Sequence, residues 1–128
     1  MSELTDLKQI GLSGKAKLSL ERLKNDGYFA EQRDAYKFAV GLCLAREIMP
    51  PELPPGGTTI YNTQTIDEDG SLAVAIKMLM PADVPPYRWA ERLAEAGITI
   101  LAELADSGKL DPSEIIRQTQ LTLAERVD

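Results

Sequence analysis

The sequence predicts a mainly α fold: a compact bundle of about five helices with one Pro-rich extended segment. Apolar residues recur at three- and four-residue spacing over most of the chain. Residues that cap helices stand where these patterns begin, and glycines stand where they end. The 128 residues are 44% hydrophobic and 27% charged, which is the size and composition of one globular domain.

The first part of the chain divides at residue 12. We expect residues 1–11 to be a flexible lead-in and residues 12–128 to form a single helical domain. A first helix is expected over residues 13–26, with Ser13 as its N-cap and Gly27 as the glycine that ends it.

A second helix is expected over residues 31–48, and its middle is apolar on nearly every side. Such a helix is buried either as the centre of a bundle or at an oligomer interface. Gly41 costs it about 1 kcal/mol relative to alanine, and close approach of another helix would explain the glycine. Three apolar positions along it are therefore candidate partner or oligomer contacts: Tyr36, Val40 and Leu44.

The middle of the chain is the least determined by pattern. Prolines between residues 50 and 55 stop the second helix, and residues 58–62 have the composition of a strand. Residues 71–80 favour a helix with Asp69 or Ser71 as its N-cap. The rival interpretation is a short β-hairpin over residues 58–77 that turns at 67–70.

Two helices are expected in the last third of the chain. One starts near Pro86 and either continues to Asp106 or breaks at Gly97. The other starts at the sequence Asp-Pro-Ser-Glu from Asp111 to Glu114, which has the pattern of a capping box, and is expected to end near residue 127.

The residue inventory argues against catalysis. The chain has no histidine and one cysteine, Cys43, which excludes Ser-His and Cys-His nucleophile pairs and the usual structural zinc site. Gly56 and Gly57 lack the lysine of a phosphate-binding loop. We therefore expect no enzyme activity, no catalytic residue, no metal and no cofactor.

One acidic run could still hold a metal. Asp67, Glu68 and Asp69 are adjacent, and a metal-dependent hydrolase built on them is one hypothesis. The calcium-loop pattern fails because Met78 stands where it needs a bidentate glutamate. A solvated acidic turn that caps the next helix is the favoured interpretation.

The helix expected from residue 86 holds two further candidates. Tyr87 and Trp89 could stack on a base, although a lone tryptophan more often anchors a core. Its charged residues stand at i,i+3 and i,i+4 spacing, which favours ion pairs on the helix surface over an acid–base pair. They are Arg88, Glu91, Arg92 and Glu95.

Charge is uneven along the chain. The net charge is −6, but residues 1–49 carry 8 Lys and Arg against 7 Asp and Glu, while residues 50–128 carry 6 against 13. An acidic chain is a poor nonspecific nucleic-acid binder, so any phosphate contact falls in the first half. The candidate nucleic-acid-binding residues, which could equally form a solvated face of mixed charge, are Lys15, Lys17, Arg22, Lys24, Arg33 and Lys37.

Four segments resemble a known group of proteins. LSGKAKLSLERLK (12–24), RDAYKFAVGLCLA (33–45), IDEDGSL (66–72) and LAEAGI (93–98) are similar to the small helical proteins of bacterial DNA-phosphorothioation (Dnd) gene clusters. The first half resembles their E component, an all-helical oligomer linked to nicked DNA through surface lysines, whereas the whole chain looks more like the short Dnd system-associated proteins. Lys15, Lys17 and Lys24 match that basic helix, and the acidic second half departs from it.

The resemblance implies an accessory subunit or adaptor in DNA modification or anti-phage defence. We expect a cytoplasmic homo-oligomer with protein partners and DNA as a candidate ligand. The start of the chain lacks the pattern of a signal peptide, and its apolar runs are too short to cross a membrane. The alternative is an antitoxin or repressor-like regulatory protein, with a basic half that binds an operator and an acidic half that binds a basic partner.

Overall fold

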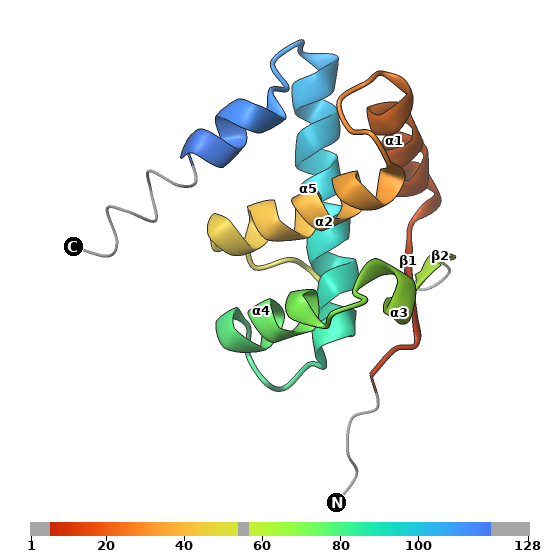
Figure 1. Ribbon diagram of the computed structural model, residues 1–128, viewed down its shortest axis with the longest axis vertical. Helices are drawn as coiled ribbons and strands as arrows, with labels where there is room; N and C mark the ends of the chain where they lie inside the picture. The colour runs from red at the N-terminus through yellow and green to blue at the C-terminus, as the bar shows by residue number, and fades with distance from the viewer. Residues whose placement is uncertain (1–5, 54–56, 119–128) are drawn as a thin grey trace, which may run out of the picture.

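The computed structural model describes residues 6–53 and 57–118, and one long helix organises it (Figure 1). The other helices pack around this helix, and a two-stranded antiparallel sheet lies at one side. The predicted mainly helical fold is confirmed. The elements are β1 (Gln9–Leu12), α1 (Gly14–Asn25), α2 (Gln32–Ala45), β2 (Thr58–Asn62), α3 (Thr63–Ile66), α4 (Ser71–Leu79), α5 (Pro86–Asp106) and a helical segment over residues 112–118.

Helix α5 is a single helix of 21 residues. Trp89, Leu93, Ile98 and Leu101 recur at helical spacing and are all buried, so one apolar stripe of α5 faces the core along its length. Gly97 does not break the helix. An ideal Cβ on Gly97 would lie 2.3 Å from the carbonyl oxygen of Ala39 in α2, which explains why only glycine fits there.

Helix α2 crosses α5 and also contacts α1 and α4. Its predicted burial is confirmed, but the neighbours that bury it belong to the same chain. Tyr36 and Val40 have no exposed surface, so they contact the chain's own core and not a partner. Their assignment as oligomer contacts is corrected, while Leu44 is half-buried.

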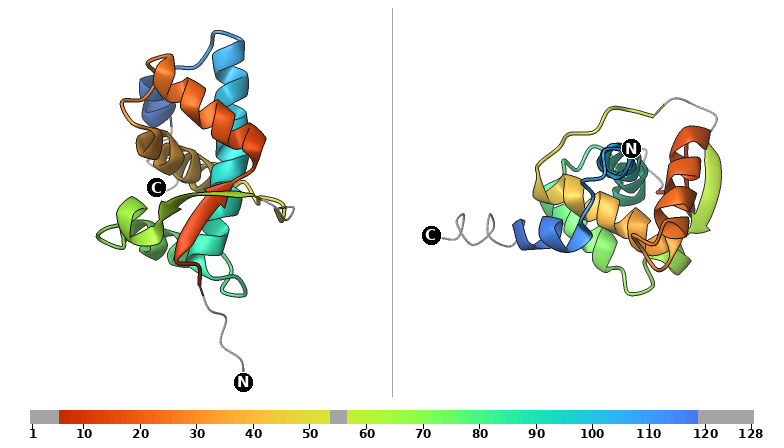
Figure 2. Two further views of the ribbon diagram at one scale, coloured as in Figure 1. Left: turned by 90° about the vertical axis from the view of Figure 1, so that its right-hand side faces the viewer. Right: turned by 90° about the horizontal axis from the view of Figure 1, so that it is seen from above.

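The sheet corrects the expected start of the domain. Residues 9–11 belong to β1 and not to a flexible lead-in, because Ile10 is fully buried and pairs with Tyr61 of β2. Strand β1 also runs along α5 (Figure 2). The pairing is irregular between Ile10 and Gly11, where an ideal Cβ on Gly11 would lie 2.3 Å from the carbonyl oxygen of Thr58. Residues 1–5 lie outside the described residues.

The ambiguous middle of the chain contains both a strand and a helix. Residues 58–62 form β2, but their partner is β1, so the hairpin over 58–77 is wrong. Residues 71–79 form α4, as favoured from the sequence. The N-cap position of α4 is Gly70, with φ of 74°, and the capping oxygens come from Asp67 and Asp69.

Several predicted helix ends are confirmed. The Ser13 hydroxyl accepts a hydrogen bond from the Ala16 N–H at 3.1 Å, and Gly27 has the left-handed φ of 84°. Helix α2 ends before residue 48, because Glu47 adopts a left-handed φ of 57°.

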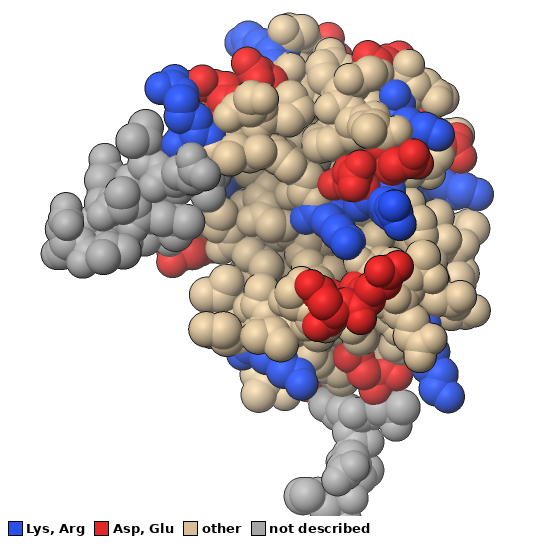
Figure 3. Space-filling model, in the orientation of Figure 1, with Lys and Arg blue, Asp and Glu red and all other residues tan. Residues whose placement is uncertain are grey.

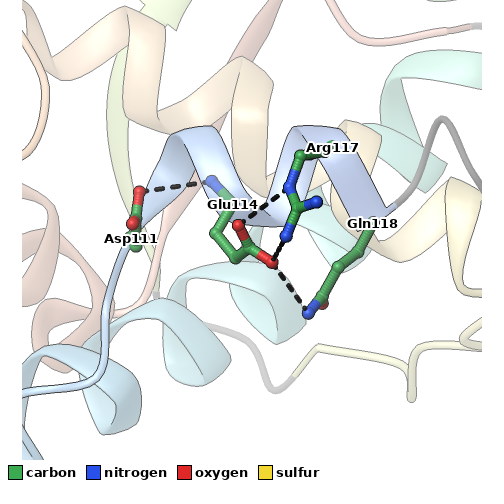
Figure 4. Close-up of polar contacts among 4 residues, drawn as sticks. All are labelled: Asp111, Glu114, Arg117 and Gln118. Carbon is green, nitrogen blue, oxygen red and sulfur yellow. Dashed lines mark hydrogen bonds and ion pairs between the residues drawn. The ribbon is translucent and has the colours of Figure 1, made fainter.

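The last helical segment begins as the capping box predicts. Asp111 accepts from the Glu114 N–H at 3.2 Å, while the Glu114 carboxylate accepts from Arg117 and Gln118 and does not return to the cap (Figure 4). The end expected near residue 127 lies outside the described residues. In the described part of the chain, no helix is both long and apolar enough to cross a membrane.

The α2–α5 crossing predicts the effect of one methyl group. We expect Gly97→Ala to lower the free energy of unfolding by about 2 kcal/mol, because its Cβ collides with Ala39 and overpacking outweighs the gain in helix propensity. Gly14→Ala is the matched control, because a Cβ at Gly14 meets nothing within 4 Å. Urea denaturation of both variants checks this, and equal stability would contradict the close crossing.

Candidate functional site

The six basic candidates divide between two helices, and acidic groups interrupt them. Lys15 and Arg22 of α1 line a groove of about 370 Å³ against α5. Its other charged residues are Glu95, Glu103 and Asp106, and Arg22 forms an ion pair with Asp106 at 2.9 Å. The remaining candidates lie on α1 (Lys17 and Lys24) and on α2 (Arg33 and Lys37).

Basic and acidic side chains also alternate on the face that carries α2 and α4 (Figure 3). A phosphate backbone is attracted most strongly by basic groups that stand together, without carboxylates between them. A DNA backbone would therefore meet both positive and negative side chains on the face shown in Figure 3. In the groove between α1 and α5 it would meet carboxylates beside the two basic side chains.

Two carboxylates of α5, those of Glu91 and Glu95, accept hydrogen bonds from Gly11 and Ser13 and not from the neighbouring arginines of the helix. The Gly11 N–H donates to Glu91 at 2.8 Å, while the Ser13 N–H and hydroxyl donate to Glu95 at 3.0 and 2.6 Å. None of the four charged residues predicted to pair on α5 forms an ion pair within the described residues. The prediction of ion pairs was wrong because it considered only the spacing along one helix. The N–H groups that use Glu91 and Glu95 as acceptors belong to residues about eighty positions earlier in the sequence.

A third carboxylate acts in the same way at the start of α5. Asp6 accepts from the Tyr87 N–H at 3.0 Å and so caps α5 from outside the helix. Residues 6–13 are thus held along α5 by three carboxylates, those of Asp6, Glu91 and Glu95. Burial raises the pKa of Glu91, although the Gly11 N–H and two nearby arginines partly offset this.

Asp67 is committed to the start of α4. Its buried carboxylate accepts from the N–H groups of Leu72 and Ala73 at 2.9 and 3.0 Å, and from the Tyr87 hydroxyl at 2.8 Å. Burial and this carboxylate together raise the pKa of Tyr87 to about 12.

Asp69 likewise accepts from Ser71, and the Ser71 N–H lowers the pKa of Asp69. The two carboxylates thus serve the acidic turn favoured from the sequence. Over residues 6–53 and 57–118, no three Asp, Glu, Cys or His side chains gather in a way that could hold a metal ion.

Trp89 is a core anchor. Its ring is almost fully buried, its indole N–H donates to the Pro81 carbonyl at 2.9 Å, and the Arg92 guanidinium lies 5.3 Å from its ring centre. A base cannot stack on a ring covered in this way. The core-anchor interpretation therefore holds for Trp89, and the Tyr87 hydroxyl is occupied by Asp67.

An apolar groove of about 500 Å³ lies between the end of α2 and the end of α4. Figure 3 shows a broad area without charged side chains where these helix ends lie in Figure 1. The predicted contact Leu44 lines the groove, and Cys43 contributes to it from its buried position. The remaining described lining residues are mostly apolar, with Glu47 as the one charged side chain among them. They are Gly41, Ala45, Glu47, Ile48, Met49, Leu79 and Met80.

Four large apolar side chains of α4 and of the segment after α2 are exposed, and two of them, Met49 and Leu79, line the groove. Met78 is 79% exposed, Leu79 63%, Met49 61% and Val74 55%. We call the groove and these four side chains the α2–α4 surface. An apolar groove with large exposed apolar side chains in it and on the same helix commonly marks a protein contact.

Sequence reasoning identified only one residue of this surface, Leu44. The missed signal was the composition of residues 71–80, in which Lys77 is the only charge. The rule that predicted burial of α2 on nearly every side applies equally to α4. In the structure α4 buries Ile76 and leaves Val74, Met78 and Leu79 exposed. The chain itself therefore packs against one face of this helix and leaves its other apolar face exposed.

Cys43 is not arranged as a nucleophile. Burial raises the pKa of its thiol to about 11, and nearby Arg46 offsets this only in part. The thiol is therefore protonated near neutral pH, whereas cysteine nucleophiles react as thiolates.

Comparisons of the chain with protein-family models, curated proteins and solved structures give no match. Function is therefore inferred from the surfaces of this fold.

Glu91 should make stability depend on pH. Its raised pKa means that the folded chain keeps this proton to higher pH than the unfolded chain, so its contribution decreases as pH rises from about 4. We expect Glu91→Gln, which keeps an oxygen for the Gly11 N–H, to be at least as stable as wild type at pH 7 and to flatten this decrease.

Glu91→Ala is the contrasting variant. It leaves the Gly11 N–H without its acceptor, and we expect a loss of about 1–2 kcal/mol. Urea denaturation between pH 4 and pH 7 measures both variants. Equal stability of the Gln and Ala variants at pH 7 would show that the Glu91 contact contributes nothing.

Proposed function

We propose that this chain is a non-enzymatic helical adaptor that binds a helix of a protein partner on its α2–α4 surface. Its setting, proposed from the resemblance in residues 12–105, is an accessory subunit of a bacterial DNA-modification or anti-phage defence system. The observation that carries the adaptor role is the apolar groove together with four exposed large apolar side chains, two of which line it.

Energetics favour a partner for this surface. Fully burying a leucine, valine or methionine side chain contributes about 1.5–3 kcal/mol, and most of this gain is still available from Met78, Leu79, Met49 and Val74. A groove between two helix ends accommodates the apolar ridge of a third helix, which is a common mode of peptide and protein recognition.

The other candidate groups support an adaptor more than a catalyst. The carboxylates of Asp67, Glu91 and Glu95 each accept hydrogen bonds from backbone N–H groups. The Cys43 thiol is buried and protonated. These groups stabilise the fold through buried contacts and hydrogen bonds. An adaptor role uses only the exposed apolar surface and requires no reactive side chain.

DNA enters this proposal through the complex. Lys15 and Arg22 face carboxylates in the α1–α5 groove, which leaves Lys17, Lys24, Arg33 and Lys37 to add nonspecific attraction to phosphate. An accessory subunit of this kind is brought to DNA by its partner and contributes little affinity alone.

The adaptor role is tested with two leucines of equal exposure. Leu79 of the α2–α4 surface and Leu18 of α1 are both 63% exposed. We expect wild type and Leu18→Glu to retain the same partner from an extract of the source cells, and Leu79→Glu to lose it, because the charge would be buried in the contact. Reconstitution from the purified components by calorimetry should show at least tenfold weaker binding for Leu79→Glu. Equal binding by both variants would place the contact elsewhere.

DNA binding is tested by fluorescence anisotropy with labelled nicked duplex. We expect no binding by the isolated chain at about 150 mM salt, and weak binding at about 20 mM salt that decreases with Lys17→Ala and Lys24→Ala together. Lys15→Ala and Arg22→Ala together, which also remove two positive charges but within the α1–α5 groove, are the matched control and should have little effect. Tight binding at the higher salt would indicate a DNA-binding subunit instead.

A further inference from the structure

We propose that the helix bound by the α2–α4 surface is α4 of a second copy of this chain. In this dimer each α4 places the ridge formed by Val74 and Met78 in the groove of the other copy, around a twofold axis. The inference rests on the proposed function, because it names the partner of the same surface.

The ridge and the groove share one helix. Val74 and Met78 are one helical turn apart and exposed, while the next residues, Leu79 and Met80, line the groove. A twofold interface uses the same patch on both chains, so the part that inserts must lie beside the part that receives it. The α2–α4 surface meets this condition within the last two turns of α4.

Gly41 supplies room for an inserted side chain. It is exposed within α2 and lines the groove, and an ideal Cβ there meets no described atom within 4 Å. A glycine inside a helix costs about 1 kcal/mol, and at Gly97 the close approach of α2 accounts for it. No described residue of another element comes within 4 Å of a Cβ built at Gly41, so the space there is free for Met78 of a second copy. The flexible thioether of methionine suits an irregular notch of this kind.

Charge agrees with this pairing. Lys77 is exposed and directly precedes the ridge residue Met78. Of the described residues that line the groove, Glu47 is the charged one, and its sign is opposite to that of Lys77. A second copy of α4 therefore brings a positive charge to the rim of a groove whose wall carries a negative one.

The available area indicates a dimer of moderate affinity. The exposed apolar side chains of the surface offer on the order of 500 Å² per chain, against about 800 Å² per partner in a standard interface. Each chain carries a net charge of −6, so the two copies also repel each other over their whole surfaces. We expect a dissociation constant in the micromolar range that decreases with added salt, because salt screens this repulsion.

Analytical ultracentrifugation of the full chain over a wide concentration range tests the dimer. We expect wild type and Leu18→Glu to change from 14.0 kDa to twice that mass, and Met78→Glu to remain at 14.0 kDa. Gly41→Leu should also remain at 14.0 kDa, because its side chain fills the notch. Leucine favours a helix more than glycine does, so loss of the dimer with unchanged circular dichroism cannot be attributed to unfolding.

Cysteine cross-linking tests the position of the contact. In chains that also carry Cys43→Ala, which removes the native thiol from the groove lining, an equimolar mixture of Gly41→Cys and Met78→Cys chains should form more disulfide-linked dimer than either variant alone. Wild type that stays monomeric at every concentration would overturn the inference, as would a dimer unaffected by Met78→Glu and Gly41→Leu. If wild type is monomeric and Leu79→Glu still loses its partner, the adaptor proposal stands and only the second copy is excluded.

Discussion

The close approach of two helices at Ala39 of α2 and Gly97 of α5 determines where the other described elements lie. With no side chain at Gly97, α2 lies directly on α5, and the two apolar faces fuse into one core. Helices α1 and α4 then pack against the same pair, and β1 follows α5. A core of this size tolerates little change in the spacing of its central pair, because interior packing is dense.

The sequence predicted what depends on neighbours a few residues apart. Helix ends at Ser13, Gly27 and Asp111 follow from local hydrogen bonds and backbone geometry, and they were correct. The partner of β2 could not be predicted, because β1 is short and separated from β2 by more than forty residues. For the same reason the Glu91 and Glu95 contacts were missed: periodicity identifies the face of a helix but not which distant N–H group needs an acceptor.

The candidate site shows the same division. Burial of α2 was predictable from its composition, but whether α5 or another chain buries it was not, and Tyr36 was therefore misassigned. Residues 71–80 have a similar composition, but there the chain buries only one face of the helix and leaves the other exposed. The two helices differ in what lies against them, which is a property of the assembled fold. An apolar helix in a sequence therefore predicts that a contact exists, and only the structure distinguishes an internal contact from an external one.

The three carboxylates that hold residues 6–13 along α5 also have a consequence for synthesis on the ribosome. Ser13 and Glu95 are 82 positions apart, so Gly11 and Ser13 lack these acceptors until synthesis has reached Glu91 and Glu95. Contacts between such distant positions form late, because a long loop must close first. Residues 6–13 therefore reach their native positions late, because they dock only after α5 has been synthesised and has folded.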